Sequence, residues 1–151
     1  MNVFVYGTLR KGFGNHYLLE TSEYLGEFRQ PIHFDMVDMG AFPGLVETNN
    51  PFSSTITVEG YKVTEETLKR LDSLEGYPSF YNRKIIKIGD IEGYIYYLNG
   101  GNRYNYKIVR EGDWLEYKYY SNRKERKREK KEKTLLRQWK NGKVQYDLEP
   151  F

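Results

Sequence analysis

Residues 64–78 read Thr-Glu-Glu-Thr-Leu-Lys-Arg-Leu-Asp-Ser-Leu-Glu-Gly-Tyr-Pro, and this stretch predicts the one clear helix in the body of the chain. Thr64 is a good N-cap residue, and the glutamates that follow it complement the positive end of a helix dipole. Gly76 suits a left-handed C-terminal stop, and Pro78 forbids continuation of the helix. We therefore expect the helix to run from Thr64 to about Glu75.

Short apolar runs rich in β-branched and aromatic residues surround this helix and predict strands. We expect strands at residues 3–6, 24–28, 33–39, 44–47, 55–63, 81–88 and 91–98, and a further strand-like segment at residues 114–120. Gly89 and Asp90 predict a tight hairpin between the strands on either side of them. Many short strands with one helix indicate an α+β fold, with the helix packed on a curved sheet or a small barrel.

The composition limits the classes of protein to which the chain can belong. Its 151 residues suit one compact domain with a short appendage. No apolar run approaches the ~20 residues that cross a bilayer, and no export signal precedes the first strand. The absence of cysteine excludes disulfides, thiolate metal sites and a thiol nucleophile. We expect a cytoplasmic protein that makes no membrane contact.

The net charge of +3 is unevenly distributed along the chain. Residues 121–140 contain ten Lys and Arg and three Glu, which leaves 14 basic and 18 acidic residues elsewhere. We therefore predict two parts, a mildly acidic domain at residues 1–120 and a basic, helical C-terminal extension at residues 121–151. Two interpretations of the extension stay open. It is either a solvated helix, or a weak contact for nucleic acid or another polyanion through residues 121–140.

Glu75 occupies an unusual position on the predicted helix. Counting about 100° per residue from Leu68 places Leu71 at about 300° and Glu75 at about 340°, so the carboxylate lies between the two leucines of the apolar face. Loss of hydration there and the negative end of the helix dipole both raise a carboxyl pKa. A raised pKa would suit proton exchange near neutral pH. The alternative is a terminal glutamate that turns into water.

A glycine-bearing loop follows the first strand and begins at Tyr6-Gly7-Thr8-Leu9. Backbone N–H groups at such a strand end can bind an anion or a developing oxyanion, and Gly7 permits close approach to the main chain. The loop does not match a phosphate-binding P-loop, because Phe13 and Gly14 stand where Lys and Ser or Thr are required. The dinucleotide fingerprint fails as well. An ordinary strand-to-loop turn is the alternative.

Five short motifs, in order, resemble those of the γ-glutamyl cyclotransferase-like family. This family includes γ-glutamylamine cyclotransferases, the butirosin-pathway cyclotransferase and plant avirulence-induced proteins. The motifs are residues 5–12 (VYGTLRKG), Asn15 with residues 18–19 and 24–26, residues 40–45 (GAFPGL), residues 71–78 (LDSLEGYP) continuing to Tyr81 and Arg83, and residues 112–114 (GDW). The resemblance covers roughly residues 2–117.

The resemblance implies a small mixed β-barrel with flanking helices and a cofactor-free reaction that releases 5-oxoproline and an amine or amino acid. It maps the family's catalytic glutamate onto Glu75. It further implies that Tyr6, Gly7, Thr8 and Leu9 hold the γ-glutamyl group of a small-molecule substrate, and it suggests Tyr81 and Arg83 as weaker candidates for the pocket. We expect no cofactor and no metal, because the chain has two histidines and lacks HExxH and GxSxG.

The family reaction predicts a division of labour between substrate and enzyme. The α-amino group of the substrate attacks its own γ-carbonyl, so the protein need not supply a nucleophile. Glu75 would act as general acid and base, and the loop N–H groups would stabilise the oxyanion. The rival hypothesis is a non-catalytic binding module of the same fold that acts through its basic extension. Neither hypothesis identifies the γ-glutamyl compound or the oligomeric state.

Overall fold

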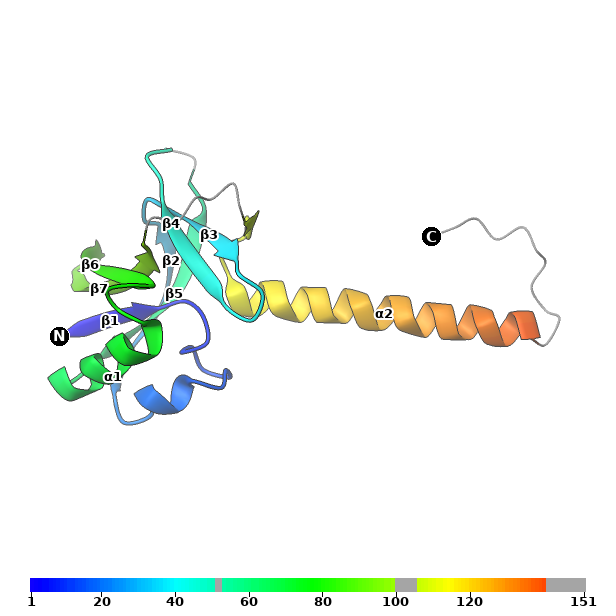
Figure 1. The fold of residues 1–151 in the computed structure, drawn as a ribbon, viewed down its shortest axis with the longest axis horizontal. Helices are drawn as coiled ribbons and strands as arrows, with labels where there is room; N and C mark the ends of the chain where they lie inside the picture. The colour runs from blue at the N-terminus through cyan, green and yellow to red at the C-terminus, as the bar shows by residue number, and fades with distance from the viewer. Residues whose placement is uncertain (51–52, 100–105, 141–151) are drawn as a thin grey trace. The chain divides into compact units, whose positions relative to one another are not determined.

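The computed structural model describes residues 1–50, 53–99 and 106–140, and the chain divides into two compact units, Met1–Leu115 and Glu116–Phe151 (Figure 1). The elements of the first unit, in chain order, are β1 (Asn2–Val5), the 3₁₀ helix η1 (His16–Leu19), β2 (Glu23–Pro31), β3 (Phe34–Asp38), β4 (Pro43–Glu47), β5 (Thr55–Lys62), α1 (Glu65–Glu75), β6 (Tyr81–Ile88), β7 (Ile91–Leu98) and β8 (Lys107–Ile108). The predicted α+β class is confirmed.

The strands form two sheets, one of five strands in the order β2-β5-β1-β7-β6 and one of three in the order β4-β3-β8. The central strand β1 pairs antiparallel with β5 and parallel with β7. Val3, Phe4 and Val5 of β1 are all buried, which explains why this strand is apolar without alternation. The loop that follows β1 therefore starts in the middle of the core.

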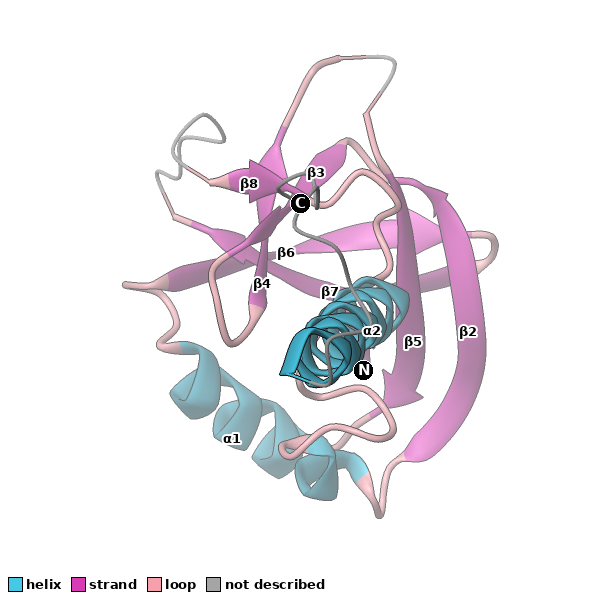
Figure 2. Ribbon diagram, turned by 90° about the vertical axis from the view of Figure 1, so that its right-hand side faces the viewer, coloured by secondary structure: helices cyan, strands magenta, loops and turns pink. Residues whose placement is uncertain are grey.

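The expected β-barrel is wrong, because the sheet is not closed. Among the described residues no strand pairing joins the edge strands β2 and β6, and β3, β4 and β8 pair with one another instead. Figure 2 shows β2 and β5 running together along one side of the unit, and β3, β4 and β8 gathered elsewhere. Alternation of apolar and polar residues predicts sheet faces well, but it does not specify which edges meet.

Helix α1 begins and ends where the sequence predicts. The Thr64 hydroxyl accepts a hydrogen bond from the Thr67 N–H at 3.1 Å. Gly76 adopts the left-handed conformation with φ 64°, and its N–H reaches the carbonyls of the last turn. Leu68 and Leu71 are buried in the core, so the predicted apolar face is also confirmed. Through this apolar face, α1 packs on the five-stranded sheet.

The predicted hairpin at Gly89-Asp90 is confirmed, since β6 and β7 pair antiparallel on either side of it and Gly89 has φ 58°. The core beneath α1 combines aliphatic residues from β1, β3, β4 and β7, from α1 and from the connecting segments with three tyrosines. Its buried members are Val3, Val5, Leu9, Leu19, Val37, Val46, Tyr61, Val63, Leu68, Leu71, Tyr81, Tyr96 and Leu98.

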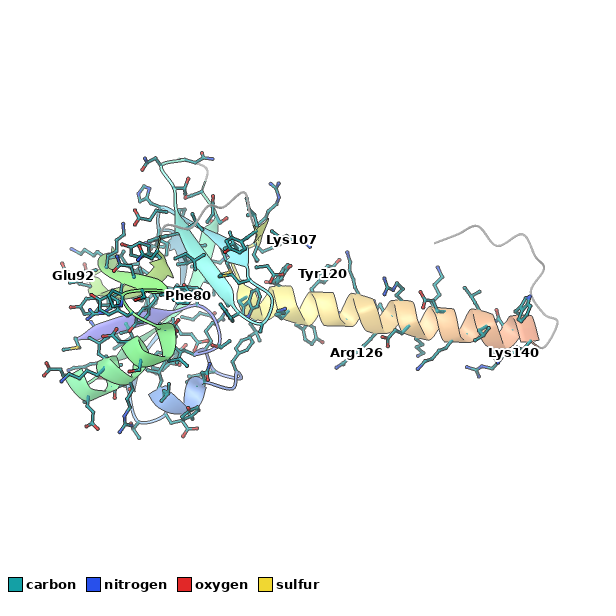
Figure 3. All side chains as sticks on the ribbon, in the orientation of Figure 1. Phe80, Glu92, Lys107, Tyr120, Arg126 and Lys140 are labelled. Atoms are coloured by element: carbon teal, nitrogen blue, oxygen red, sulfur yellow. The ribbon has the colours of Figure 1, made fainter. Side chains whose placement is uncertain are left out.

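The helix α2 (Trp114–Lys140) contains the basic segment. The prediction of a strand at residues 114–120 is wrong, because α2 begins at Trp114. Aromatic residues favour strands in isolation, but here they continue directly into a long run of Lys, Arg and Glu that propagates a helix. None of the described helices is long and apolar enough to span a membrane. Side chains project along the length of α2, Arg126 and Lys140 among them (Figure 3). Residues 141–151 of the predicted extension lie outside the described residues.

Candidate active site

A cavity of about 350 Å³ opens beside the end of β1 and the C-terminal turn of α1. Its wall combines the loop after β1, the turn before β4, the end of α1, and residues from β6 and β7. The lining residues are Phe4, Val5, Tyr6, Gly7, Thr8, Leu9, Asn15, Ala41, Phe42, Pro43, Leu74, Glu75, Phe80, Tyr81 and Tyr96.

Glu75 is the only acidic or basic residue among these lining residues. Burial raises the pKa of its carboxyl from 4.5 to about 7, because the cavity wall replaces the water that would solvate the charge. No hydrogen bond joins this carboxylate to any other of the described residues. A carboxyl group in this state exchanges protons readily near neutral pH.

Three tyrosines from three different segments of the chain face Glu75. Tyr6 follows β1, Tyr81 starts β6 and Tyr96 lies on β7. Burial is the main cause that raises the pKa of each hydroxyl, and the Glu75 charge contributes to all three shifts. Their hydroxyls donate to other acceptors at 2.7 Å, namely the Tyr96 carbonyl, the Pro43 carbonyl and the Asp72 carboxylate respectively. The tyrosines therefore form a neutral wall around the glutamate and leave its oxygens free for a ligand.

The loop after β1 is held close to the turn before β4. A Cβ atom on Gly7 would lie 2.8 Å from Cδ and Cγ of Pro43, so only glycine fits between the two segments. Among the described residues no hydrogen bond uses the backbone N–H of Gly7, Thr8 or Leu9. Three successive N–H groups beside the cavity are therefore available to an anion or an oxyanion.

Arg10 holds this loop in place through both its side chain and its backbone. Its guanidinium is 1% exposed and lies 2.9 Å from each of three carboxylates, those of Glu27 on β2, Glu59 on β5 and Asp113 ahead of α2. Its backbone N–H also donates to the Gly7 carbonyl at 3.0 Å. Because guanidinium forks bind several carboxylate oxygens in fixed geometry, this cluster ties the loop to both β2 and β5.

The structure brings together most of the site residues expected from the sequence. Glu75, Tyr81 and the segment Tyr6 to Leu9 all line the cavity. Arg83 does not line it and is instead ion-paired with Asp72, its Nε lying 2.9 Å from Asp72 Oδ1.

The sequence analysis did not identify Tyr96 or Phe80 as parts of the cavity wall. Tyr96 lies on a strand whose neighbouring positions are also aromatic, so nothing in the local pattern distinguishes it. Phe80, 47% exposed, follows the Gly-Tyr-Pro stop of α1, and its large exposed ring is a signal that only the structure makes visible. In the part of the chain that the structure describes, no group of three His, Asp or Glu residues could hold a metal ion.

The sequence model of the γ-glutamyl cyclotransferase, AIG2-like family matches residues 3–116. The chain belongs to this family. The match contains the whole cavity and ends just after α2 begins, so the resemblance seen in the short motifs is confirmed over the first unit.

Relatives of known name agree with this assignment. The γ-glutamylcyclotransferase family protein YtfP of Escherichia coli is 32% identical over 98 residues, covering 64% of this chain and 82% of the relative. The γ-L-glutamyl-butirosin B γ-glutamyl cyclotransferase of Niallia circulans is 43% identical over 77 residues, covering 50% of this chain and 46% of the relative. The solution structure of YtfP from Escherichia coli matches with a TM-score of 0.61 and 28% identity, covering 78% of this chain and 99% of YtfP.

Proposed function

We propose that this protein is a γ-glutamyl cyclotransferase in which Glu75 is the catalytic acid and base. The supporting observation is a cavity lined by both the Glu75 carboxyl and the segment Gly7 to Leu9, whose backbone N–H groups form no hydrogen bond with other described residues. Burial in this cavity raises the pKa of Glu75 to about 7. Family membership supports an activity of this type. The substrate is a small molecule in which a γ-glutamyl group is joined to an amine through an amide bond.

The reaction requires no external nucleophile. The α-amino nitrogen of the substrate forms a bond to its own γ-carbonyl carbon, and the bond from that carbon to the leaving nitrogen breaks. Well-oriented intramolecular attack reaches effective molarities of ~10⁵–10⁸ M, so holding the substrate in a bent conformation provides much of the rate. The products are 5-oxoproline and the free amine or amino acid.

Glu75 would carry the proton between the two nitrogens. Its ionised carboxylate removes a proton from the attacking amine, and the resulting acid returns that proton to the leaving nitrogen. A group with a pKa near 7 performs both steps at neutral pH without a large penalty in either. The N–H groups of Gly7, Thr8 and Leu9 would stabilise the oxyanion or the substrate carboxylate.

Glu75→Gln tests this assignment. Gln keeps the shape of the side chain but cannot exchange the proton, so 5-oxoproline release should fall by about 10²–10⁴-fold while the fold is retained. The assay is 5-oxoproline formation from a panel of γ-glutamyl amines, γ-glutamyl amino acids and glutathione. The matched control is Glu66→Gln, which changes an exposed glutamate on the outer face of the same helix. Undiminished turnover by Glu75→Gln would refute the role.

The basic segment supports a second, independent candidate activity. Residues 121–140 carry a charge balance of +7, and the lysines and arginines of α2 from residue 123 onward are exposed. We propose a weak contact with nucleic acid or another polyanion through phosphate neutralisation. Titrating a labelled DNA fragment at two salt concentrations, with the full chain and with residues 121–151 removed, tests it. Affinity that is independent of salt and of these residues would rule it out.

A further inference from the structure

Arg83 contacts the chain on both sides of Glu75. Its Nε lies 2.9 Å from Oδ1 of Asp72, and its Nη2 donates to Oδ2 at 3.3 Å. Asp72 precedes Glu75 by three residues on α1. The same guanidinium lies 4.4 Å from the ring centre of Tyr77, two residues beyond Glu75. One side chain from β6 thus holds the residues that flank the proposed catalytic glutamate.

Two tyrosines of β7 complete this arrangement. The Tyr94 ring covers the guanidinium at 4.3 Å, on which Tyr77 also packs. The Tyr96 hydroxyl donates to Oδ1 of Asp72 at 2.7 Å, and the Tyr96 carbonyl accepts from the Tyr6 hydroxyl at the same distance. Asp72 therefore joins the last turn of α1 to Tyr96 of the cavity wall and, through Tyr96, to Tyr6 at the start of the loop after β1.

The pair also balances charge close to Glu75. Residues three apart on a helix are neighbours on its surface, so Asp72 and Glu75 are neighbours on α1, and the Tyr96 hydroxyl interacts with both of them. Both members of the pair are largely buried, with side-chain exposures of 17% for Arg83 and 19% for Asp72. The hydroxyls of Tyr6 on the β1 side, Tyr81 on β6 and Tyr96 on β7 are the other titratable groups facing Glu75, and all three are neutral near pH 7.

We propose that Asp72 and Arg83 are positioning residues that hold Glu75 against the cavity and keep net charge away from it. This inference rests on the proposed function of Glu75. It assigns Arg83 to the support of α1 instead of to direct contact with the substrate. Without Arg83, the unpaired Asp72 carboxylate would raise the pKa of Glu75. Without Asp72, the unpaired guanidinium would lower it.

The test compares Asp72→Asn, Arg83→Gln and the double variant in the full chain. The pKa of Glu75 is measured by ¹³C NMR of its side-chain carboxyl and, separately, from the pH dependence of kcat/KM for 5-oxoproline release. We expect Arg83→Gln to raise the pKa and Asp72→Asn to lower it, each by about 0.5–1 unit. The double variant should return the pKa to within about 0.3 unit of the wild-type value.

The matched control is Arg70→Gln, which breaks the exposed Arg70–Glu66 pair on the same helix and should leave the pKa of Glu75 unchanged.

Arg83→Lys separates charge from geometry. Lysine keeps the positive charge but loses the planar fork that contacts two oxygens and two rings. We expect the pKa of Glu75 to stay within about 0.3 unit of the wild-type value while kcat falls at least threefold. Because this variant retains the ion pair, it also provides a measurement if a neutral substitution prevents folding.

The outcomes are distinguishable. If the two single variants shift the Glu75 pKa in the same direction, or leave it unchanged, the positioning role is wrong even where turnover is reduced. If the wild-type protein releases no 5-oxoproline from any substrate, the proposed function fails. Opposite NMR shifts in the two single variants would then still establish the charge balance around Glu75.

Discussion

Glu59 and Glu75 are two glutamates of one small unit, and their surroundings differ in the number of hydrogen-bond donors. Glu59 is 4% exposed, and its oxygens accept from the Arg10 guanidinium at 2.9 Å, the Lys11 N–H at 3.0 Å and the Tyr61 hydroxyl at 2.8 Å. Glu75 accepts none from the described residues, although it also sits among tyrosines. Proteins ordinarily surround a buried charged group with hydrogen-bond partners, as is the case for Glu59.

We infer from this difference that the two carboxylates have different roles. The donors around Glu59 satisfy the hydrogen-bonding capacity of its oxygens, and through Arg10 this carboxylate holds the loop after β1 in place. Among the described residues the wall around Glu75 supplies no donor, and burial raises its pKa to about 7. The raised pKa costs stability at neutral pH, and a carboxyl group with such a pKa suits the proposed proton exchange. The half-buried Glu75 without donors is therefore the better candidate for chemistry, and the buried Glu59 with several donors is the structural residue.

The largest expected effect on stability is at the satisfied carboxylate. Glu59→Gln replaces a side chain that accepts three hydrogen bonds with an amide of similar shape, while Arg10 keeps two other carboxylates. We expect the free energy of unfolding to fall by about 2–4 kcal/mol, because removing one partner leaves buried charge less well compensated. Urea unfolding at pH 7 measures this. A loss below about 0.5 kcal/mol would mean that the cluster adds little and that the comparison with Glu75 fails.

A smaller effect of opposite sign is expected at Glu75. Its pKa is raised in the folded state, so the stability it contributes is fully present below pH 4.5 and is lost as the pH rises through about 7. Gln is neutral throughout and avoids this loss. Glu75→Gln should therefore match the wild type near pH 4 and exceed it by about 1–3 kcal/mol at pH 8. Thermal or urea unfolding at both pH values provides the measurement, and a variant less stable than wild type at pH 8 would contradict the account.

Local sequence patterns predicted much of the unit that forms the site. The capping residues and the leucine spacing of α1 located Glu75 on the apolar face, and the end of the apolar run at Tyr6 located the loop that lines the cavity. These features depend on neighbours within one turn or one strand, so the chain carries their signal locally.

Features that depend on distant residues were not predicted. Arg10 contacts three carboxylates that lie 17, 49 and 103 positions further along the chain. Tyr96 contacts Asp72, from which it is separated by 24 positions. Arg83 was expected in the pocket because it belongs to the same sequence motif as Glu75. A motif does not distinguish a residue that contacts the substrate from one that supports its neighbours. The start of α2 was missed because the aromatic residues at 114–120 suggested a strand, whereas the helix-forming residues that follow determined the structure.

The most direct test of the central claim is the pKa of Glu75 itself. A ¹³C NMR titration of the glutamate side-chain carboxyls from pH 3 to 9, with the Glu75 resonance assigned by its absence in Glu75→Gln, measures it in the folded protein. The account predicts a midpoint at about 7. A midpoint near the ordinary value of 4.5 would mean that water solvates this carboxylate and that it is not the acid–base group of the site.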